Sequence, residues 1–147
     1  MSNQHNDLHS NVVVRRGTSP VAIGTTGTGQ VGKIIDRLGF GGLEFLIAYG
    51  NITATGATFT VTVKEGDATG AMTSVADSNL IGTEALAGLA AGTPRTSGVL
   101  KNVTKKIGYK GNKRYVQCSV KSTATAGALI AVDALLFNPE SSTGNAS

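Results

Sequence analysis

The sequence predicts an all-β domain, an antiparallel β-sandwich or jelly-roll-like barrel with an extended N-terminal arm and a short polar C-terminal tail. Three observations support this fold class. Glycine occurs 20 times in 147 residues, about twice its average usage, and tryptophan is absent. Short strand-like runs recur between turn signals, without a convincing strand–helix–strand unit. Charged residues make up only 15% of the chain, so Thr, Ser, Asn and Gly are expected to cover the surface, or neighbouring subunits to cover part of it.

The chain is long enough for one domain, and its composition divides it into three parts. Residues 1–33 contain one apolar cluster and are expected to form an extended arm, with one short strand at residues 12–16. Residues 34–139 carry the recurring apolar runs and are expected to form the β-sandwich core. Residues 140–147 form a polar tail that is not expected to fold on its own.

The clearest strand is expected at residues 57–64, ATFTVTVK, where apolar side chains face one way and Thr or Lys side chains face the other. Residues 43–49, LEFLIAY, form a denser apolar run, which predicts a strand buried on both faces. Residues 114–121, RYVQCSVK, alternate again. The preceding Lys-Gly-Asn-Lys sequence at residues 110–113 predicts a hairpin turn between two strands.

Two further elements require a choice between helix and strand. Residues 128–137, ALIAVDALLF, are long enough for a helix, but their Val and Ile content and the neighbouring strands favour a strand. Asp133 interrupts this run, and an exposed position is expected for it because burying an unpaired charge costs several kcal/mol. Residues 84–91, EALAGLAA, are the one expected helix, which Gly88 weakens by about 1 kcal/mol.

Residues 24–33, GTTGTGQVGK, match two nucleotide-binding patterns, G-x-G-x-x-G and G-x-x-x-x-G-K. A phosphate-binding loop needs Ser or Thr after its lysine to hold Mg²⁺, and here Ile34 follows Lys33. Glycines at positions 39, 41 and 42 occupy the place where the helix of such a site should run. We therefore interpret the segment as a flexible Gly/Thr-rich joint between arm and core, and we predict no cofactor.

No group of residues predicts catalysis or metal binding, so the chain is expected not to be an enzyme. His5 and His9 have the i, i+4 spacing of a helical metal pair, but they lack the Glu of H-E-x-x-H and lie in a polar terminus. Cys118 is the single cysteine, which excludes an intramolecular disulfide and cysteine-based metal frameworks. It shares a strand face with Val116 and Val120, so a buried, inert thiol is expected.

Cations gather in one part of the sequence. Between residues 85 and 132 there is no Asp or Glu, whereas eight Lys or Arg residues are present. This stretch fits either a nucleic-acid patch, with Tyr109 and Tyr115 available for stacking, or a surface that faces solvent or an acidic protein. No RNA- or DNA-binding signature is present, so nucleic acid is not the expected partner. The expected partner-contact residues are Lys101, Lys105, Lys106, Lys110, Lys113 and Arg114.

The sequence contains no membrane or export signal. A transmembrane helix needs about 18 or more consecutive apolar residues, and no such run occurs. Residues 1–11 are polar and lack the apolar region of a secretory signal. The chain is therefore expected to be made in a reducing cytoplasm and to have no membrane partner.

Four segments follow one another between residues 34 and 140: IIDRLGFGGLEFLIAYGNI, ATFTVTVKEGDATGAMTSVADSNLIGTE, KIGYKGNKRYVQCSV and ALIAVDALLFNPE. Their order resembles that of small virion proteins of tailed bacteriophages, of the head-decoration or minor structural kind. The I-G-Y-x-G-x-K-R-Y-V element is the most specific part of this resemblance, and residues 1–33 fall outside it.

The resemblance implies a non-enzymatic virion component with a β-sandwich core. We expect a decoration or cement protein on the capsid surface, assembled in the host cytoplasm, that binds the major capsid protein and stabilises the shell. Self-association is also expected, and analogy with proteins on a local threefold axis favours a trimer. A head–tail or tail component is the alternative location. A nucleic-acid-binding module that uses residues 95–121 is the alternative from a different class.

Overall fold

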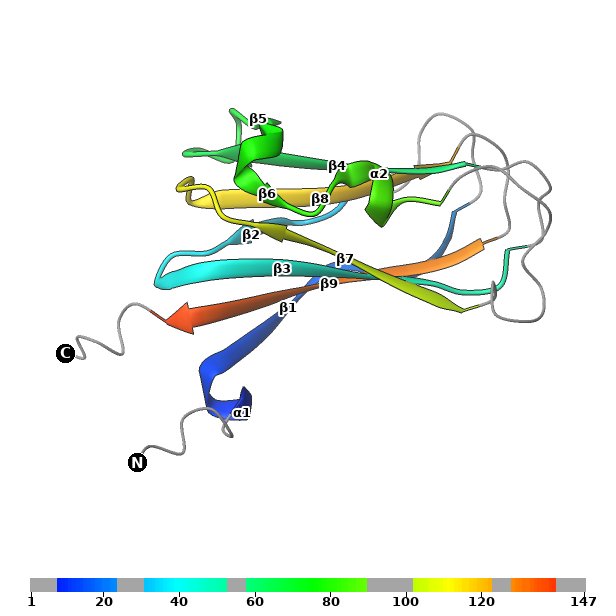
Figure 1. The fold of residues 1–147 in the computed structure, drawn as a ribbon, viewed down its shortest axis with the longest axis horizontal. Coiled ribbons are helices and arrows are strands. Elements are labelled where there is room, and N and C mark those ends of the chain that lie inside the picture. Colours follow the sequence, from blue (N-terminus) through cyan, green and yellow to red (C-terminus); the bar gives the residue numbers. More distant parts are fainter. Residues whose placement is uncertain (1–7, 24–30, 53–57, 90–101, 123–127, 140–147) are drawn as a thin grey trace.

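The computed structural model describes residues 8–23, 31–52, 58–89, 102–122 and 128–139. Two antiparallel sheets pack face to face, which confirms the predicted β-sandwich (Figure 1). The five-stranded sheet has the order β1-β9-β3-β7-β6, and the four-stranded sheet has the order β2-β8-β4-β5. The strands are β1 (Val12–Ile23), β2 (Ile34–Asp36), β3 (Phe40–Tyr49), β4 (Phe59–Gly66), β5 (Thr73–Ser74), β6 (Leu80–Ile81), β7 (Val103–Tyr109), β8 (Tyr115–Ser122) and β9 (Ala128–Pro139). The short helices are α1 (Leu8–Asn11), the 3-10 turn η2 (Asp77–Asn79) and α2 (Glu84–Ala87).

The strand order is that of a jelly roll. If the short β6 is left aside, one sheet has the order β1-β9-β3-β7 and the other has the order β2-β8-β4-β5. Successive strands therefore alternate between the two sheets from β1 to β4, and again from β7 to β9. The sequence predicted either a β-sandwich or a jelly-roll-like barrel. The strand order shows a β-sandwich whose strands are connected as in a jelly roll.

The core lies between the two sheets and is built from alternate residues of the long strands. Phe45 and Ile47 of β3, Val61 of β4 and Val116 of β8 are almost completely buried. Tyr49 joins this core, with its ring edge-on to Phe59 at 5.7 Å and its hydroxyl donating to the Ala87 carbonyl at 2.8 Å. The strand predicted at residues 57–64 is confirmed from Phe59 onward, because Phe59, Val61 and Val63 face inward while Thr60, Thr62 and Lys64 are exposed. Residue 57 lies outside the described residues.

Two predicted elements differ from the structure in detail. The run at residues 43–49 is a strand, but only its inner face is fully buried, since Ala48 is exposed and Leu46 only half-buried. The predicted helix is shorter than expected, because Gly88 ends α2 after Ala87, and residues 90–91 lie outside the described residues. The ambiguous run at residues 128–137 is confirmed as a strand, and Asp133 is exposed on it as predicted.

More of the N-terminal segment belongs to the five-stranded sheet than the sequence suggests. The short strand expected at residues 12–16 extends to residue 23, and it pairs along its length with β9, from Val12 opposite Phe137 to Ile23 opposite Ala128. This part of the predicted arm is therefore an edge strand of the core. Local composition gives no sign of it because the apolar partners come from the other end of the chain. Residues 24–30 of the predicted joint and residues 140–147 of the predicted tail lie outside the described residues.

Candidate interaction surfaces

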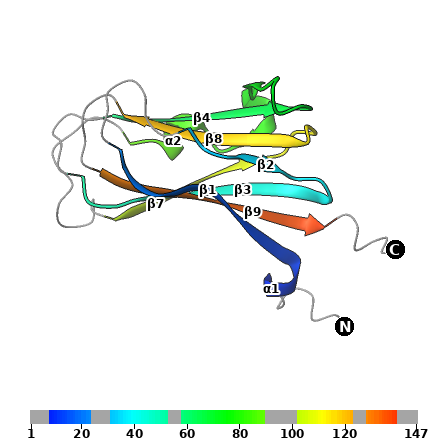
Figure 2. The ribbon, with the colours of Figure 1, turned by 180° about the vertical axis from the view of Figure 1, so that it is seen from behind.

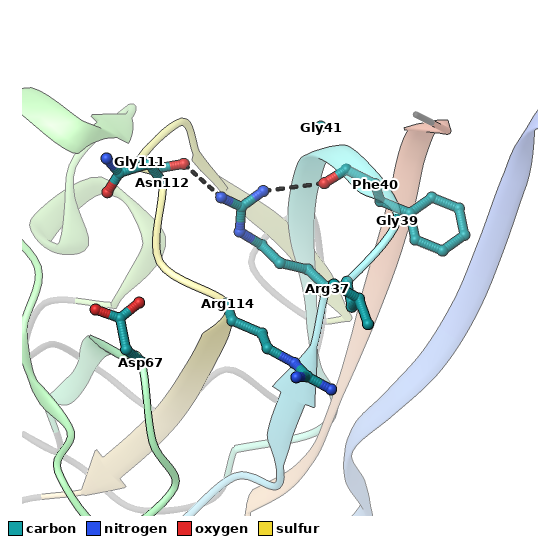
Figure 3. A pocket seen from close by; sticks show the side chains of 9 residues that line it. Arg37, Gly39, Phe40, Gly41, Asp67, Gly111, Asn112 and Arg114 are labelled. Carbon is teal, nitrogen blue, oxygen red and sulfur yellow. Dashed lines mark hydrogen bonds between the residues drawn. The ribbon is translucent and has the colours of Figure 1, made fainter. Parts of the chain in front are cut away.

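One end of the sandwich is organised by a single arginine. Arg37 follows β2, and its guanidinium donates three hydrogen bonds to backbone carbonyls, at 2.6 Å to Lys113, 2.7 Å to Gly111 and 3.0 Å to Phe40. Figure 3 shows the bonds to Gly111 and Phe40. The guanidinium also lies 5.2 Å from the centre of the Tyr109 ring. Arg37 thereby ties the β7–β8 turn to the β2–β3 connection.

The Tyr109 hydroxyl forms two further hydrogen bonds at the same end of the sandwich. It donates to the Glu65 carboxylate and accepts the backbone N–H of Lys113 at 3.0 Å. Burial, together with the hydrogen bond to Glu65, raises the pKa of Tyr109 to about 12. The phenol therefore stays protonated at neutral pH and serves as a structural donor.

A cleft of about 390 Å³ lies beside Arg37, lined by the β2–β3 connection, the β7–β8 turn and Asp67 (Figure 3). Its charged groups already have partners. Arg114 donates to both oxygens of Asp36 at 2.9 and 2.8 Å, and Lys113 contacts Asp67 at 2.7 Å. The lining residues include no histidine or cysteine. This end of the sandwich is thus a structural clamp, and none of its described residues places a nucleophile beside a base.

The structure does not gather the predicted partner-contact residues into one patch. Lys101 lies outside the described residues. Lys105 and Lys106 are neighbours on β7, so their side chains leave opposite faces of the sheet. Lys110, Lys113 and Arg114 do lie together at the β7–β8 turn, but the last two form ion pairs with Asp67 and Asp36. The hydrogen bond from Arg114 also lowers the pKa of Asp36.

The candidates for chemistry play structural parts where the structure describes them. Gly32 belongs to the nucleotide-like motif, and its backbone lies so close to the Cys118 carbonyl that a Cβ there would overlap the oxygen. Residues 24–30 of the motif and His5 are outside the described residues, and His9 is exposed in α1. No group of His, Cys, Asp and Glu side chains suitable for a metal ion occurs among the described residues. In that same part of the chain, no helix has the length and apolar character to cross a membrane.

Cys118 is a buried thiol on the inner face of β8, as predicted. Burial raises its pKa to about 12. We expect the native thiol to react with a disulfide reagent at pH 8 about a hundredfold more slowly than the thiol of the unfolded chain, because only the exposed thiolate attacks. Absorbance of the released reagent, with and without guanidinium, measures both rates. Equal rates in the two conditions would contradict burial of this side chain.

The two outer faces of the sandwich differ in chemistry. On the four-stranded sheet, most outward positions of the two central strands are polar: Thr60, Thr62, Lys64, Gln117, Ser119 and Lys121, with Gly66 and Tyr115 at one end. This face has the alternation expected of a sheet that contacts water.

The outer face of the five-stranded sheet is largely apolar. Its outward positions on β1, β3, β6 and β9 include Val14, Leu46, Ala48, Ile81, Leu129, Ala131, Leu135 and Phe137. Several of these are well exposed, with 59% for Val14, 55% for Leu129 and 54% for Ile81. We call this the apolar face. The aromatic ring of Phe137 lies across Gly42, where a side chain would collide with it.

The charges on the apolar face balance. Arg16 of β1 lies opposite Asp133 of β9, and the Glu44 and Lys106 side chains lie on β3 and β7. Glu44 is half-buried, and desolvation raises its pKa while the charge of Lys106 acts in the opposite direction. Among the described residues, the face thus carries two cations and two anions, in a chain of net charge +4. Sequence reasoning missed this surface, although the dense apolar runs at residues 43–49 and 128–137 contained the signal.

No protein-family model and no curated relative matches this chain. Among solved structures, it is similar to that of the N-terminal CBM22-1–GH10 modules of Clostridium thermocellum endo-1,4-β-D-xylanase 10B complexed with xylohexaose. The identity is 13% and the TM-score 0.41, over 86% of this chain and 24% of that chain. It is also similar to a structure of infectious bursal disease virus Gx strain, at 13% identity and a TM-score of 0.31, over 91% of this chain and 43% of that chain. The chain thus spans less than half of either protein, and neither likeness bears on function.

Proposed function

We propose that this chain is a non-enzymatic virion structural protein of a tailed phage, which decorates the capsid by binding the major capsid protein and itself. The observation that carries the proposal is the apolar face. Water-exposed apolar side chains gathered on one sheet face are typical of a protein–protein contact, whereas single exposed apolar residues are ordinary. The polar outer face of the four-stranded sheet gives the sandwich one side for the partner and one for solvent.

The composition of the apolar face also favours association between like subunits. Its two cations and two anions allow close approach without net repulsion, although the whole chain is positive. Glu44 is half-buried beside Lys106 with its pKa raised, so a partner group that donates to this carboxylate would stabilise the contact. A homo-oligomer on the capsid, with a trimer favoured by the resemblance to decoration proteins, fits these features.

Two alternatives remain as competing functions. A head–tail or tail component would use the same apolar face against a different ring of subunits. A nucleic-acid-binding module has less support, because the predicted cations lie on different surfaces and two of them are ion-paired. It requires a DNA mobility shift at low salt that weakens steeply as salt increases.

The apolar face is tested by adding charge to it. We expect Val14→Lys combined with Leu129→Lys to reduce occupancy on shells of the co-encoded major capsid protein at least about tenfold, because a lysine must be desolvated in the contact. Co-sedimentation of the chain with shells measures occupancy, and sedimentation velocity of the chain alone measures self-association. Thr60→Lys combined with Thr62→Lys adds the same charge to the polar outer face and should leave both values unchanged.

If the apolar-face variant occupies shells and self-associates as the parent chain does, the proposed role of this face is wrong. If shells bind neither the parent nor the control variant, while electron microscopy of the particles places the chain in the tail, the tail alternative is correct. Circular dichroism of each variant shows whether the sandwich remains folded, so that a loss of binding is not a loss of structure.

A further inference from the structure

A second surface lies where the edge strands of the two sheets separate. β1 is at the edge of the five-stranded sheet and β2 at the edge of the four-stranded sheet. They meet where the Lys33 amide donates to the Gly17 carbonyl at 2.7 Å, and from there they diverge toward the α1 end of the molecule (Figure 2). A cleft of about 350 Å³ lies between them, lined by Arg15, Arg16, Lys33, Ile34, Ile35 and Asp36.

The cations of this cleft have no acidic partner in the described part of the chain. Arg15, Arg16 and Lys33 are all exposed. Arg15 donates only to the Val14 carbonyl of its own strand, at 3.4 Å, and none of the three cations forms an ion pair with a described carboxylate. Asp36, the one acidic residue of the cleft, already receives both hydrogen bonds of Arg114. The cleft is therefore positive, with its charge free for a ligand.

The backbone beside the cleft is also available. β1 pairs with β9 along one edge only, and the amide of Lys33 is the one described backbone group that hydrogen-bonds to its other edge. A free strand edge presents a row of N–H and C=O groups to which an extended segment can add as a further strand. Residues 12–16 thus offer backbone pairing directly beside the three cations.

We propose that this cleft, defined as the β1–β2 groove, binds an extended acidic protein segment. The segment adds to the free edge of β1, and its carboxylates lie against Arg15 and Lys33, because the next side chain on β1, that of Arg16, leaves the opposite, apolar face of the sheet. A carboxylate-bearing segment fits better than nucleic acid, because the residues that line the groove include no aromatic side chain for base stacking, whereas the free edge of β1 suits an extended polypeptide. Ile34, which is half-buried, gives the segment an apolar contact beside the charges, whereas Ile35 belongs to the core. The β1–β2 groove is independent of the proposed function, since its test needs no capsid.

Fluorescence anisotropy with a labelled peptide of alternating Glu and Thr tests the groove in the full-length chain. We expect saturable binding that weakens at least about tenfold when Arg15 and Lys33 are both replaced by Gln, because two charge contacts are lost. The matched control replaces Lys64 and Lys121 by Gln, which removes the same charge from exposed positions elsewhere. This control should bind the peptide with nearly the affinity of the parent chain.

Two altered peptides distinguish binding in the β1–β2 groove from general charge attraction. A peptide with Gln in place of Glu should not bind, and a peptide methylated at alternate backbone nitrogens should bind about tenfold more weakly, because it cannot pair with β1. The proposal is overturned if the groove variant and its control lose affinity equally, or if the methylated peptide binds as well as the parent peptide. It is also overturned if a thymidine oligonucleotide binds in the groove more tightly than the acidic peptide.

Discussion

Arg37→Ala is expected to lower the free energy of unfolding by about 3 kcal/mol, because it removes a charged donor from three backbone carbonyls at once. Gly111 and Lys113 lie in the β7–β8 turn and Phe40 is the first residue of β3, so the three carbonyls come from two segments far apart in the sequence. The cation–π contact with Tyr109 is lost as well. Urea unfolding followed by far-UV circular dichroism measures the change; the chain has no tryptophan to report it by fluorescence.

Two further variants show whether the geometry of Arg37 or its charge matters. Arg37→Lys keeps the charge but cannot direct a planar set of donors to three carbonyls, so it should recover only a small part of the lost stability. Arg114→Ala removes a guanidinium from the same end of the sandwich, but its ion pair with Asp36 is exposed to solvent and should contribute little. Equal destabilisation by Arg37→Ala and Arg114→Ala would contradict the clamp.

Gly32→Ala is expected to destabilise the protein by about 3 kcal/mol through a collision with the backbone, which cannot turn aside as a side chain can. The new Cβ would overlap the carbonyl oxygen of Cys118 in β8. Relief requires residues 31–33 to move away from the sheet. That movement would break the bonds that hold them, from the Gly32 amide to Ser119 Oγ at 3.1 Å and from Gln117 Nε2 to the Gly32 carbonyl at 2.6 Å.

Gly70→Ala is the matched control for this substitution. A Cβ at Gly70 would have no atom within 4 Å, and its backbone needs no left-handed conformation. It should therefore unfold at the same urea concentration as the parent chain, or slightly higher, because alanine restricts the unfolded state. If Gly32→Ala is as stable as Gly70→Ala, the close approach of residue 32 to β8 is not a feature of the folded protein.

Local patterns in the sequence were reliable where one side of a strand faces the core. The period of two at residues 57–64 and 114–121 identified β4 and β8, together with the burial of Cys118. Each of these inferences depends only on neighbours in the chain, since alternation follows directly from the geometry of one strand. The Lys-Gly-Asn-Lys sequence does lie between two strands, but the predicted hairpin is wrong, because β7 and β8 belong to different sheets and do not pair with each other.

The sequence pattern failed where the environment of a strand depends on the distant element that pairs with it or packs on it. Residues 17–23 contain Gly, Ser and Pro and show no alternation, yet they form β1 because β9 supplies a pairing edge. The run at residues 43–49 predicted burial on both faces, whereas one of its faces is the exposed apolar face. A dense apolar run looks the same whether its second face meets a helix, another sheet or a separate subunit.

Periodicity and composition act over a few residues, and they were enough to predict the all-β class, most of the strands, the buried thiol and the exposure of Asp133. The folded chain was needed to show which strands share a sheet, that Arg37 joins two distant segments, and that Arg15 lies beside Lys33. It also separated the cations predicted to act together, since the alternating faces of β7 and the carboxylates of Asp36 and Asp67 divide them. These outcomes depend on contacts between residues far apart in the chain, and no local pattern encodes which distant residues will meet.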